Sequence, residues 1–145
     1  MYGDFACPRC ALAWDRLADA PIRLVFRHFA LKTKHRRAVA LSCAAEAAGL
    51  QGAFWEFADV VYGDPGRTDD PHLWAHAEAL GLDVDRFDAD RRGSAAAERV
   101  ARDVRDALKA GATATPTLFA AGEVYPGPPS EELVREWTCS DTKDE

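Results

Sequence analysis

Residues 2–10, Tyr-Gly-Asp-Phe-Ala-Cys-Pro-Arg-Cys, constrain the fold of this chain more than any other stretch. Cys7 and Cys10 are separated by two residues, and Pro8 follows the first cysteine. Proline is favoured in the first turn of a helix, where its missing N–H costs no intrahelical hydrogen bond. Apolar residues then recur at helical spacing. The pattern predicts a short strand followed by a helix that begins at Cys7.

This placement would make Cys7 a reactive thiol. The first N–H groups of a helix have no partner within the helix, and together with the macrodipole they favour a negatively charged sulfur there. Only the thiolate attacks disulfides. The sequence therefore predicts a nucleophilic cysteine at the start of the helix.

Metal and haem sites are the alternatives for a C-x-x-C pair, and the spacing disfavours both. A structural zinc site needs two more ligands, usually a second close pair, whereas Cys43 and Cys139 are isolated. Covalent haem attachment needs histidine after the second cysteine, and residue 11 is alanine. His72 and His76 share a predicted helix without a third ligand. We therefore predict a redox pair and no metal site. Cys43, inside a predicted alanine-rich helix, is expected to be a small buried side chain.

Length and composition predict one globular domain, residues 1–145. Hydrophobic residues make up 48% of the 145 and charged residues 29%, and a chain of this size can bury a full core. The net charge of −6 indicates no nucleic-acid partner. No apolar run approaches the ~20 residues of a membrane span, and the start carries no secretory signal pattern. These features predict a cytoplasmic protein, in which a C-x-x-C is more often catalytic than structural.

The remaining patterns predict a sheet in two parts around a set of helices. A strand–helix–strand unit at the start implies a parallel pair with a right-handed crossover. Five helices follow, and then two strands and a last helix. The predicted elements after the first helix are strand 22–29, helix 36–48 ended by Gly49, helix 52–62, a helix capped by Asp70 that stops at Gly81, a short helix from Asp83, helix 94–109, strands 115–120 and 123–125 joined through Ala121-Gly122, and a helix capped by Ser130.

Two predictions concern charged residues. In helix 94–109, Val100 and Leu108 belong to a predicted buried stripe, and the charged residues opposite are expected to face solvent. Asp4 has two interpretations. It is either a proton acceptor near Cys10 or a solvated loop residue, and the second is favoured because aspartate is mostly exposed in proteins.

These features together resemble the DsbA-like branch of the thioredoxin superfamily over nearly the whole chain. The resemblance implies an α/β, thioredoxin-like fold with a central mixed sheet, a short first strand and an all-helical insertion between the second and third strands. The thioredoxin-like part would comprise residues 1–33 and 111–138, and the insertion residues 34–110. The motifs that carry the resemblance are residues 2–5 leading into 7–10 and Ala-Thr-Pro-Thr at 114–117, supported by residues 26–29 and 53–55.

The resemblance also implies thiol–disulfide oxidoreductase activity. Cys7 would be the nucleophile and Cys10 the resolving thiol. Pro8-Arg9 is the dipeptide that varies in the family, and the permanent charge of Arg9 is expected to stabilise a nearby thiolate. A cis Pro116 would face the cysteines, because X-Pro bonds adopt cis at low cost. We therefore expect a catalytic group of Cys7, Pro8, Arg9 and Cys10, with Thr115 and Pro116 binding substrate through the backbone.

The partners that follow are protein or peptide substrates carrying thiols or disulfides, and a redox partner that no residue identifies. The redox-active Cys7–Cys10 disulfide would serve in place of a cofactor, and no pattern specifies an oligomeric state. Two other functions stay open for the same fold. One is a binding or redox-regulatory module. The other is a glutathione-dependent transferase or isomerase, which would not require Cys10.

Overall fold

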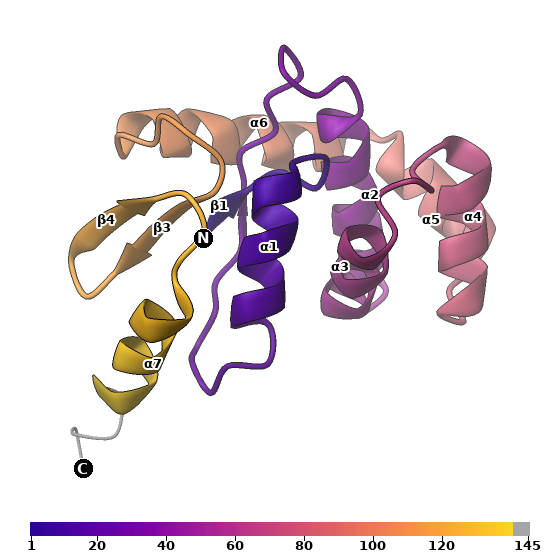
Figure 1. The fold of residues 1–145 in the computed structure, drawn as a ribbon. Coiled ribbons are helices and arrows are strands. Elements are labelled where there is room, and N and C mark those ends of the chain that lie inside the picture. Colours follow the sequence, from indigo (N-terminus) through magenta and orange to yellow (C-terminus); the bar gives the residue numbers. More distant parts are fainter. Residues whose placement is uncertain (141–145) are drawn as a thin grey trace.

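A four-stranded mixed sheet organises the chain, and the computed structural model describes residues 1–140 of it (Figure 1). The strand order is β2-β1-β3-β4. The short strand β1 (Tyr2–Gly3) pairs in parallel with β2 (Arg27–His28) and antiparallel with β3 (Thr117–Ala120). β3 continues antiparallel into β4 (Glu123–Pro126). The predicted thioredoxin-like mixed sheet with a short first strand is confirmed, while residues 141–145 of the predicted single domain lie outside the described residues.

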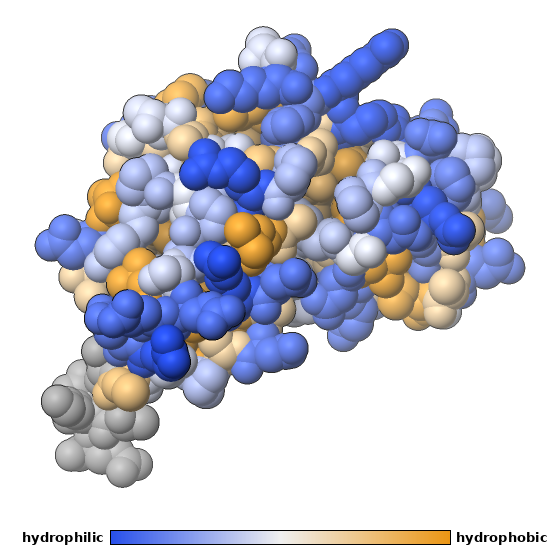
Figure 2. All heavy atoms as spheres, in the orientation of Figure 1, coloured by the Kyte–Doolittle hydropathy of each residue, from blue (hydrophilic) through white to orange (hydrophobic). Residues whose placement is uncertain are grey.

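Helices cover the sheet and form the insertion between its two parts. α1 (Pro8–Leu17) connects β1 to β2, and the five helices predicted between β2 and β3 are present. Figure 1 shows α2 to α5 beside α1, with α6 running behind the sheet. Figure 2 shows hydrophilic side chains over much of this face. Within residues 1–140, no helix combines the length and apolar character needed to cross a membrane. The other helices are α2 (Ala38–Leu50), α3 (Phe54–Gly63), α4 (Asp70–Ala79), α5 (Val84–Arg91), α6 (Ser94–Lys109) and α7 (Glu131–Ser140).

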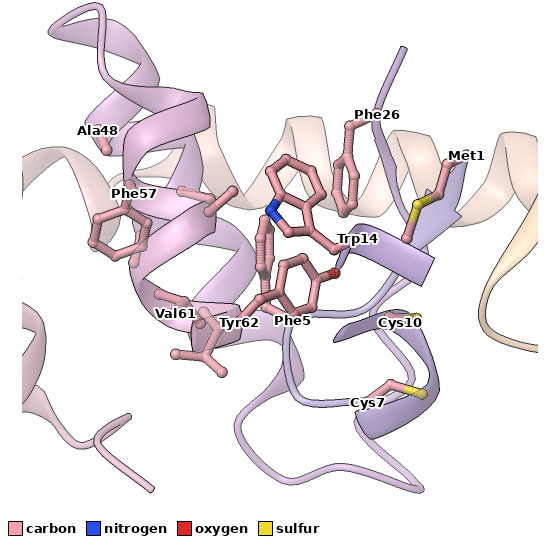
Figure 3. Close-up of a cluster of buried hydrophobic side chains, with 14 of the residues drawn as sticks. Met1, Phe5, Cys7, Cys10, Trp14, Phe26, Ala48, Phe57, Val61 and Tyr62 are labelled. Atoms are coloured by element: carbon pink, nitrogen blue, oxygen red, sulfur yellow. The ribbon is translucent and has the colours of Figure 1, made fainter. Parts of the chain in front are cut away.

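An aromatic cluster holds α1 against the insertion (Figure 3). The ring of Phe5 lies 5.1 Å from that of Phe26 and 4.9 Å from that of Tyr62, centroid to centroid. Trp14 of α1 packs on Tyr62 and donates its indole N–H to Asp59 of α3 at 2.6 Å. Aromatic pairs at such distances contribute about 0.5–1.5 kcal/mol each beyond the area that they bury. These contacts fix the position of the first turn of α1, where the two cysteines lie.

The second strand is shorter than predicted. Only Arg27–His28 of the predicted strand 22–29 belong to the sheet. Before this strand, the Met1 amino group donates to the Val25 carbonyl at 2.8 Å. Alternation and β-propensity describe how a segment fits a sheet surface, but the partner strand sets how much of it is paired. The pairing of β1 with β2 comprises Tyr2 with Arg27 and Gly3 with His28.

Two helix boundaries also differ from the prediction. α2 continues through Gly49, and the glycine with left-handed backbone after its end is Gly52, with φ of +78°. Asp70 does not cap α4 but is its first residue, and Asp69 is the N-cap. The Asp70 carboxylate instead forms an ion pair with Arg37 at 3.0 Å.

The buried stripe of α6 is offset from the predicted one. It runs through Val100, Asp103 and Ala107, whereas Leu108 is 60% exposed. Asp103 is 2% exposed, which contradicts the solvated charged face predicted for it. Its carboxylate accepts the backbone N–H of His28 at 3.1 Å and pairs with Arg99 at 3.3 Å. Ion pairing and hydrogen bonding of this kind offset the cost of burying a carboxylate.

Candidate functional site

The two cysteines lie at the N-terminal end of α1. Cys7 is the N-cap residue with extended backbone (φ −94°, ψ 120°), and the helix begins at Pro8. The Cys7 carbonyl accepts the N–H of Cys10 at 3.1 Å and that of Ala11 at 3.2 Å, which closes the first turn. Figure 3 shows both sulfurs on the side of this turn that faces away from α3. The two sulfurs are not bonded to each other.

Thr115 reaches the Cys7 sulfur from 108 residues further along the chain. Its hydroxyl donates to Cys7 Sγ at 3.4 Å, and the Cys7 thiol donates to the Thr115 carbonyl at 3.7 Å. The Thr115–Pro116 peptide bond is cis. β3 begins at the next residue, Thr117, which pairs with Tyr2 of β1. The pairing of β3 with β1 therefore brings the Thr115–Pro116 segment close to the two cysteines.

The hydroxyl of Thr115 is a contribution that sequence reasoning missed. The sequence predicted a role for its backbone alone, as a partner for a substrate strand. A hydroxyl donor to sulfur can stabilise a thiolate, because hydrogen bonding to the charged form of a group favours that form. The available signal was the residue type, since an apolar residue before Pro116 would have supplied the same backbone without a donor.

Cys10 lies deeper than Cys7 and has no exposed surface. The backbone N–H of Asp4 donates to Cys10 Sγ at 3.4 Å. Burial raises the pKa of the Cys10 thiol well above its ordinary value, and the nearby Cys7 raises it further. Cys10 therefore holds its proton at neutral pH.

Asp4 is fully buried, so the solvated loop residue favoured by the sequence is wrong. Its carboxylate accepts the N–H of Ala6 at 2.8 Å and that of Leu31 at 3.4 Å. Its backbone carbonyl accepts the hydroxyl of Tyr62 at 3.2 Å. Burial raises the pKa of Asp4, and the two backbone hydrogen bonds offset part of that rise. A carboxyl group that can hold or release a proton thus lies beside the cysteine pair.

Arg9 is exposed and extends toward the loop after β4. A Cβ atom built on Gly127 would lie 2.6 Å from the Arg9 guanidinium. The N–H of Gly127, a residue with φ of +89°, donates to the Pro116 carbonyl at 2.7 Å. The guanidinium therefore lies against the loop whose Gly127 is hydrogen-bonded to Pro116. Among residues 1–140 no hydrogen bond joins Arg9 to Cys7.

The other cysteines and histidines lie apart from this site. Cys43 is buried within α2, as predicted, and Cys139 is exposed on α7. His28 of β2 is buried and contacts Glu46 at 2.6 Å. Within residues 1–140, no three or more His, Cys, Asp or Glu side chains are grouped in a way that could hold a metal ion.

Comparison with known families places the chain. Residues 18–136 match the model of the DSBA-like thioredoxin domain. The chain belongs to the DsbA-like thioredoxin family. The matched region contains the whole helical insertion and the Thr115–Pro116 segment, and it begins after Cys10. Membership of the DsbA-like family therefore rests on the fold and the proline loop, and the cysteine pair is an independent observation.

Solved structures share the DsbA-like fold over nearly the full chain. A thioredoxin-like oxidoreductase from Silicibacter pomeroyi aligns with a TM-score of 0.83 and 23% identity, covering 99% of this chain and 85% of that one. The thiol-disulfide exchange protein alpha-DsbA2 from Wolbachia pipientis aligns with a TM-score of 0.82 and 16% identity, covering 96% and 78%. At these identities the likeness establishes the fold.

Curated relatives are much longer proteins. A protein of Salinispora arenicola named Na(+)/H(+) antiporter NhaA 1 is 42% identical over 134 residues, which is 87% of this chain and 20% of that protein. One of Herminiimonas arsenicoxydans named Na(+)/H(+) antiporter NhaA is 41% identical over 127 residues, or 83% and 20%. The chain thus spans about a fifth of the length of these relatives.

Proposed function

We propose that this DsbA-like protein exchanges disulfides with thiols of protein or peptide substrates through Cys7 and Cys10. The observation that carries the proposal is the position of the Cys7 sulfur. It lies at the start of a helix and accepts a hydrogen bond from Thr115 at 3.4 Å, with Cys10 buried one helical turn away. This arrangement supplies an attacking sulfur and a second sulfur that stays protonated until it is needed.

The exchange proceeds in two steps with a net transfer of two electrons. The Cys7 thiolate attacks one sulfur of a substrate disulfide, forms a mixed disulfide and displaces the other substrate sulfur, which takes up a proton. Cys10 then loses its proton and attacks the Cys7 sulfur. This forms the Cys7–Cys10 disulfide and releases the second substrate thiol. The reverse sequence oxidises a substrate dithiol, and the relative redox potentials of the two pairs set the direction.

Four neighbouring groups support these steps. The Thr115 hydroxyl and the positive end of the α1 macrodipole stabilise negative charge on Cys7. The buried Asp4 carboxyl accepts the proton that Cys10 must lose, and its raised pKa brings it nearer to the pH at which such a base works best. The backbone around Pro116 pairs with the substrate chain as an added edge strand.

The test is a comparison of Cys10→Ser, Cys7→Ser and wild type with a peptide disulfide. Cys10→Ser should accumulate a covalent adduct between Cys7 and the peptide, visible by mass spectrometry without reductant, because attack proceeds and resolution fails. Cys7→Ser should form none. Cys139→Ser, at an exposed cysteine of α7, serves as the matched control and should turn over like wild type.

Two outcomes would contradict the proposal. Full turnover by Cys10→Ser in the presence of glutathione would favour the glutathione-dependent alternative. A lack of adduct in every variant would favour a binding or regulatory module. The antiporter activity in the names of the curated relatives is outside the proposal, because the chain matches only 20% of their length.

A further inference from the structure

A cavity of about 450 Å³ opens beside Cys7, between the first turn of α1 and the loop that leads into α2. Its volume is in the range of sites that hold small ligands or a few peptide side chains. The inner wall is mostly apolar, so it suits an aliphatic or aromatic group. Among the apolar lining residues, Pro8 and Pro65 are exposed, Ala6 and Ala11 are partly exposed, and Leu41 and Val61 are buried.

Basic residues line another part of this cavity. The consecutive residues Lys34, His35, Arg36 and Arg37 line it, and among residues 1–140 no aspartate or glutamate does. The chain as a whole carries a net charge of −6, so this concentration of positive charge differs from the rest of the molecule. Figure 2 shows strongly hydrophilic side chains at the top of the molecule, where Figure 1 places the loop before α2.

Two of these cations are available to a ligand. Arg37 is engaged within the protein, since its guanidinium donates to the Thr68 carbonyl at 2.8 Å and pairs with Asp70 at 3.0 Å. These bonds anchor the loop against α4. Lys34 and Arg36 are exposed and form no ion pair within residues 1–140. Arg37 therefore holds the loop in place, while Lys34 and Arg36 keep two positive charges that form no ion pair within residues 1–140.

We propose that this cavity binds the segment of a substrate polypeptide next to its reacting cysteine, and that it selects segments combining an apolar side chain with a carboxylate. The inference rests on the proposed function. A substrate sulfur must reach Cys7 Sγ, and Cys7 itself lines the cavity. Neighbouring substrate residues on that side can enter it, with the apolar group against the exposed lining residues Pro8 and Pro65 and the carboxylate near Lys34 and Arg36. Complementary charge of this kind selects partners and speeds their association.

The experiment measures attack of reduced protein on three peptides, each with one cysteine activated as a mixed disulfide with neutral 2-thiopyridine. The peptides are identical except for the residue next to a leucine–cysteine pair, which is Glu, Gln or Lys. We expect the Glu peptide to react fastest and the Lys peptide slowest. Each exposed ion pair is worth up to about 1 kcal/mol, so Lys34→Ala/Arg36→Ala should lower the Glu-over-Lys rate ratio about five-fold or more at low salt.

The matched control is Lys32→Ala, which removes an exposed cation of the same loop that does not line the cavity. Its rate ratio should equal that of wild type, and added salt should reduce the wild-type ratio. Equal rates for the three peptides, or an equal loss in Lys32→Ala, would overturn the inference while leaving the proposed function in place.

A small dianionic disulfide, oxidised glutathione, provides the second arm. If its rate fell in Lys34→Ala/Arg36→Ala while the three peptides reacted alike, the occupant would be a small thiol compound and the polypeptide proposal would be wrong. If the Gln peptide gave no adduct at Cys7 in Cys10→Ser, the proposed function would fail, and this inference with it.

Discussion

The replacement Thr115→Val tests whether a single hydroxyl activates the nucleophile. Valine has nearly the shape of threonine but removes the donor that lies 3.4 Å from Cys7 Sγ. Hydrogen bonds to charged groups contribute about 1.5–3 kcal/mol. We take the lower end, about 1.5 kcal/mol, because sulfur is a weak acceptor. That free energy corresponds to about one pH unit in the equilibrium between thiol and thiolate.

The assay is the rate of alkylation of Cys7 by iodoacetamide as a function of pH, in protein kept reduced. The half-maximal rate should move to a pH about one unit higher in Thr115→Val, with the plateau at high pH unchanged. Thr117→Val is the matched control, since the Thr117 hydroxyl donates to the Ala114 carbonyl at 2.6 Å and not to sulfur. Superimposed profiles for Thr115→Val and wild type, or an equal shift in Thr117→Val, would refute this account of Cys7.

Three further predictions concern stability and are checked by urea unfolding of the reduced protein. Asp103→Ala should cost about 1–3 kcal/mol, because it leaves a buried backbone N–H of β2 without an acceptor, whereas the exposed Asp106→Ala on the same helix should cost almost nothing. Asp4→Asn should gain stability relative to wild type as pH rises from about 4 to about 7. The pKa of Asp4 is raised above its ordinary 3.8, so its ionisation favours the unfolded chain; a constant difference across that range would count against the burial argument. Gly127→Ala should lower the free energy of unfolding by about 1–2 kcal/mol because of its φ of +89°, and should lower it further because the new Cβ would clash with Arg9. Adding Arg9→Ala should recover only the loss due to the clash.

Features set by a few neighbouring residues could be predicted from the sequence. Pro8 after Cys7 marked the start of α1, and Ser130 marked that of α7, where its hydroxyl accepts the N–H of Leu133 at 3.1 Å. The hairpin through Ala121-Gly122 has positive φ at both residues, 50° and 79°, as such two-residue turns require. In each case the local chemistry admits few backbone conformations, so the pattern is informative by itself.

Features set by distant parts of the chain could not be predicted. The length of β2 depends on a two-residue partner strand, and the burial of Asp103 depends on the N–H of His28, 75 residues away. The depth of Asp4 depends on Tyr62 and Leu31, which close over it from two other segments. Residue type gives the prior expectation that aspartate is solvated. Partners that become neighbours only in the folded protein reverse that expectation.

The pairing of Tyr2 with Thr117 has a consequence for how this protein can change over evolutionary time. Cys7 follows Tyr2 closely, and Thr115 precedes Thr117 by two residues. These two short segments, here called the tethers, align the Cys7 sulfur with the Thr115 hydroxyl. Adding or deleting one residue in either tether would displace one side by about 3.3 Å, the rise of an extended residue. The connections between the inserted helices carry no such requirement. Length variation among descendants of this chain should therefore accumulate in the loops between α2 and α6, while the two tethers keep their residue counts.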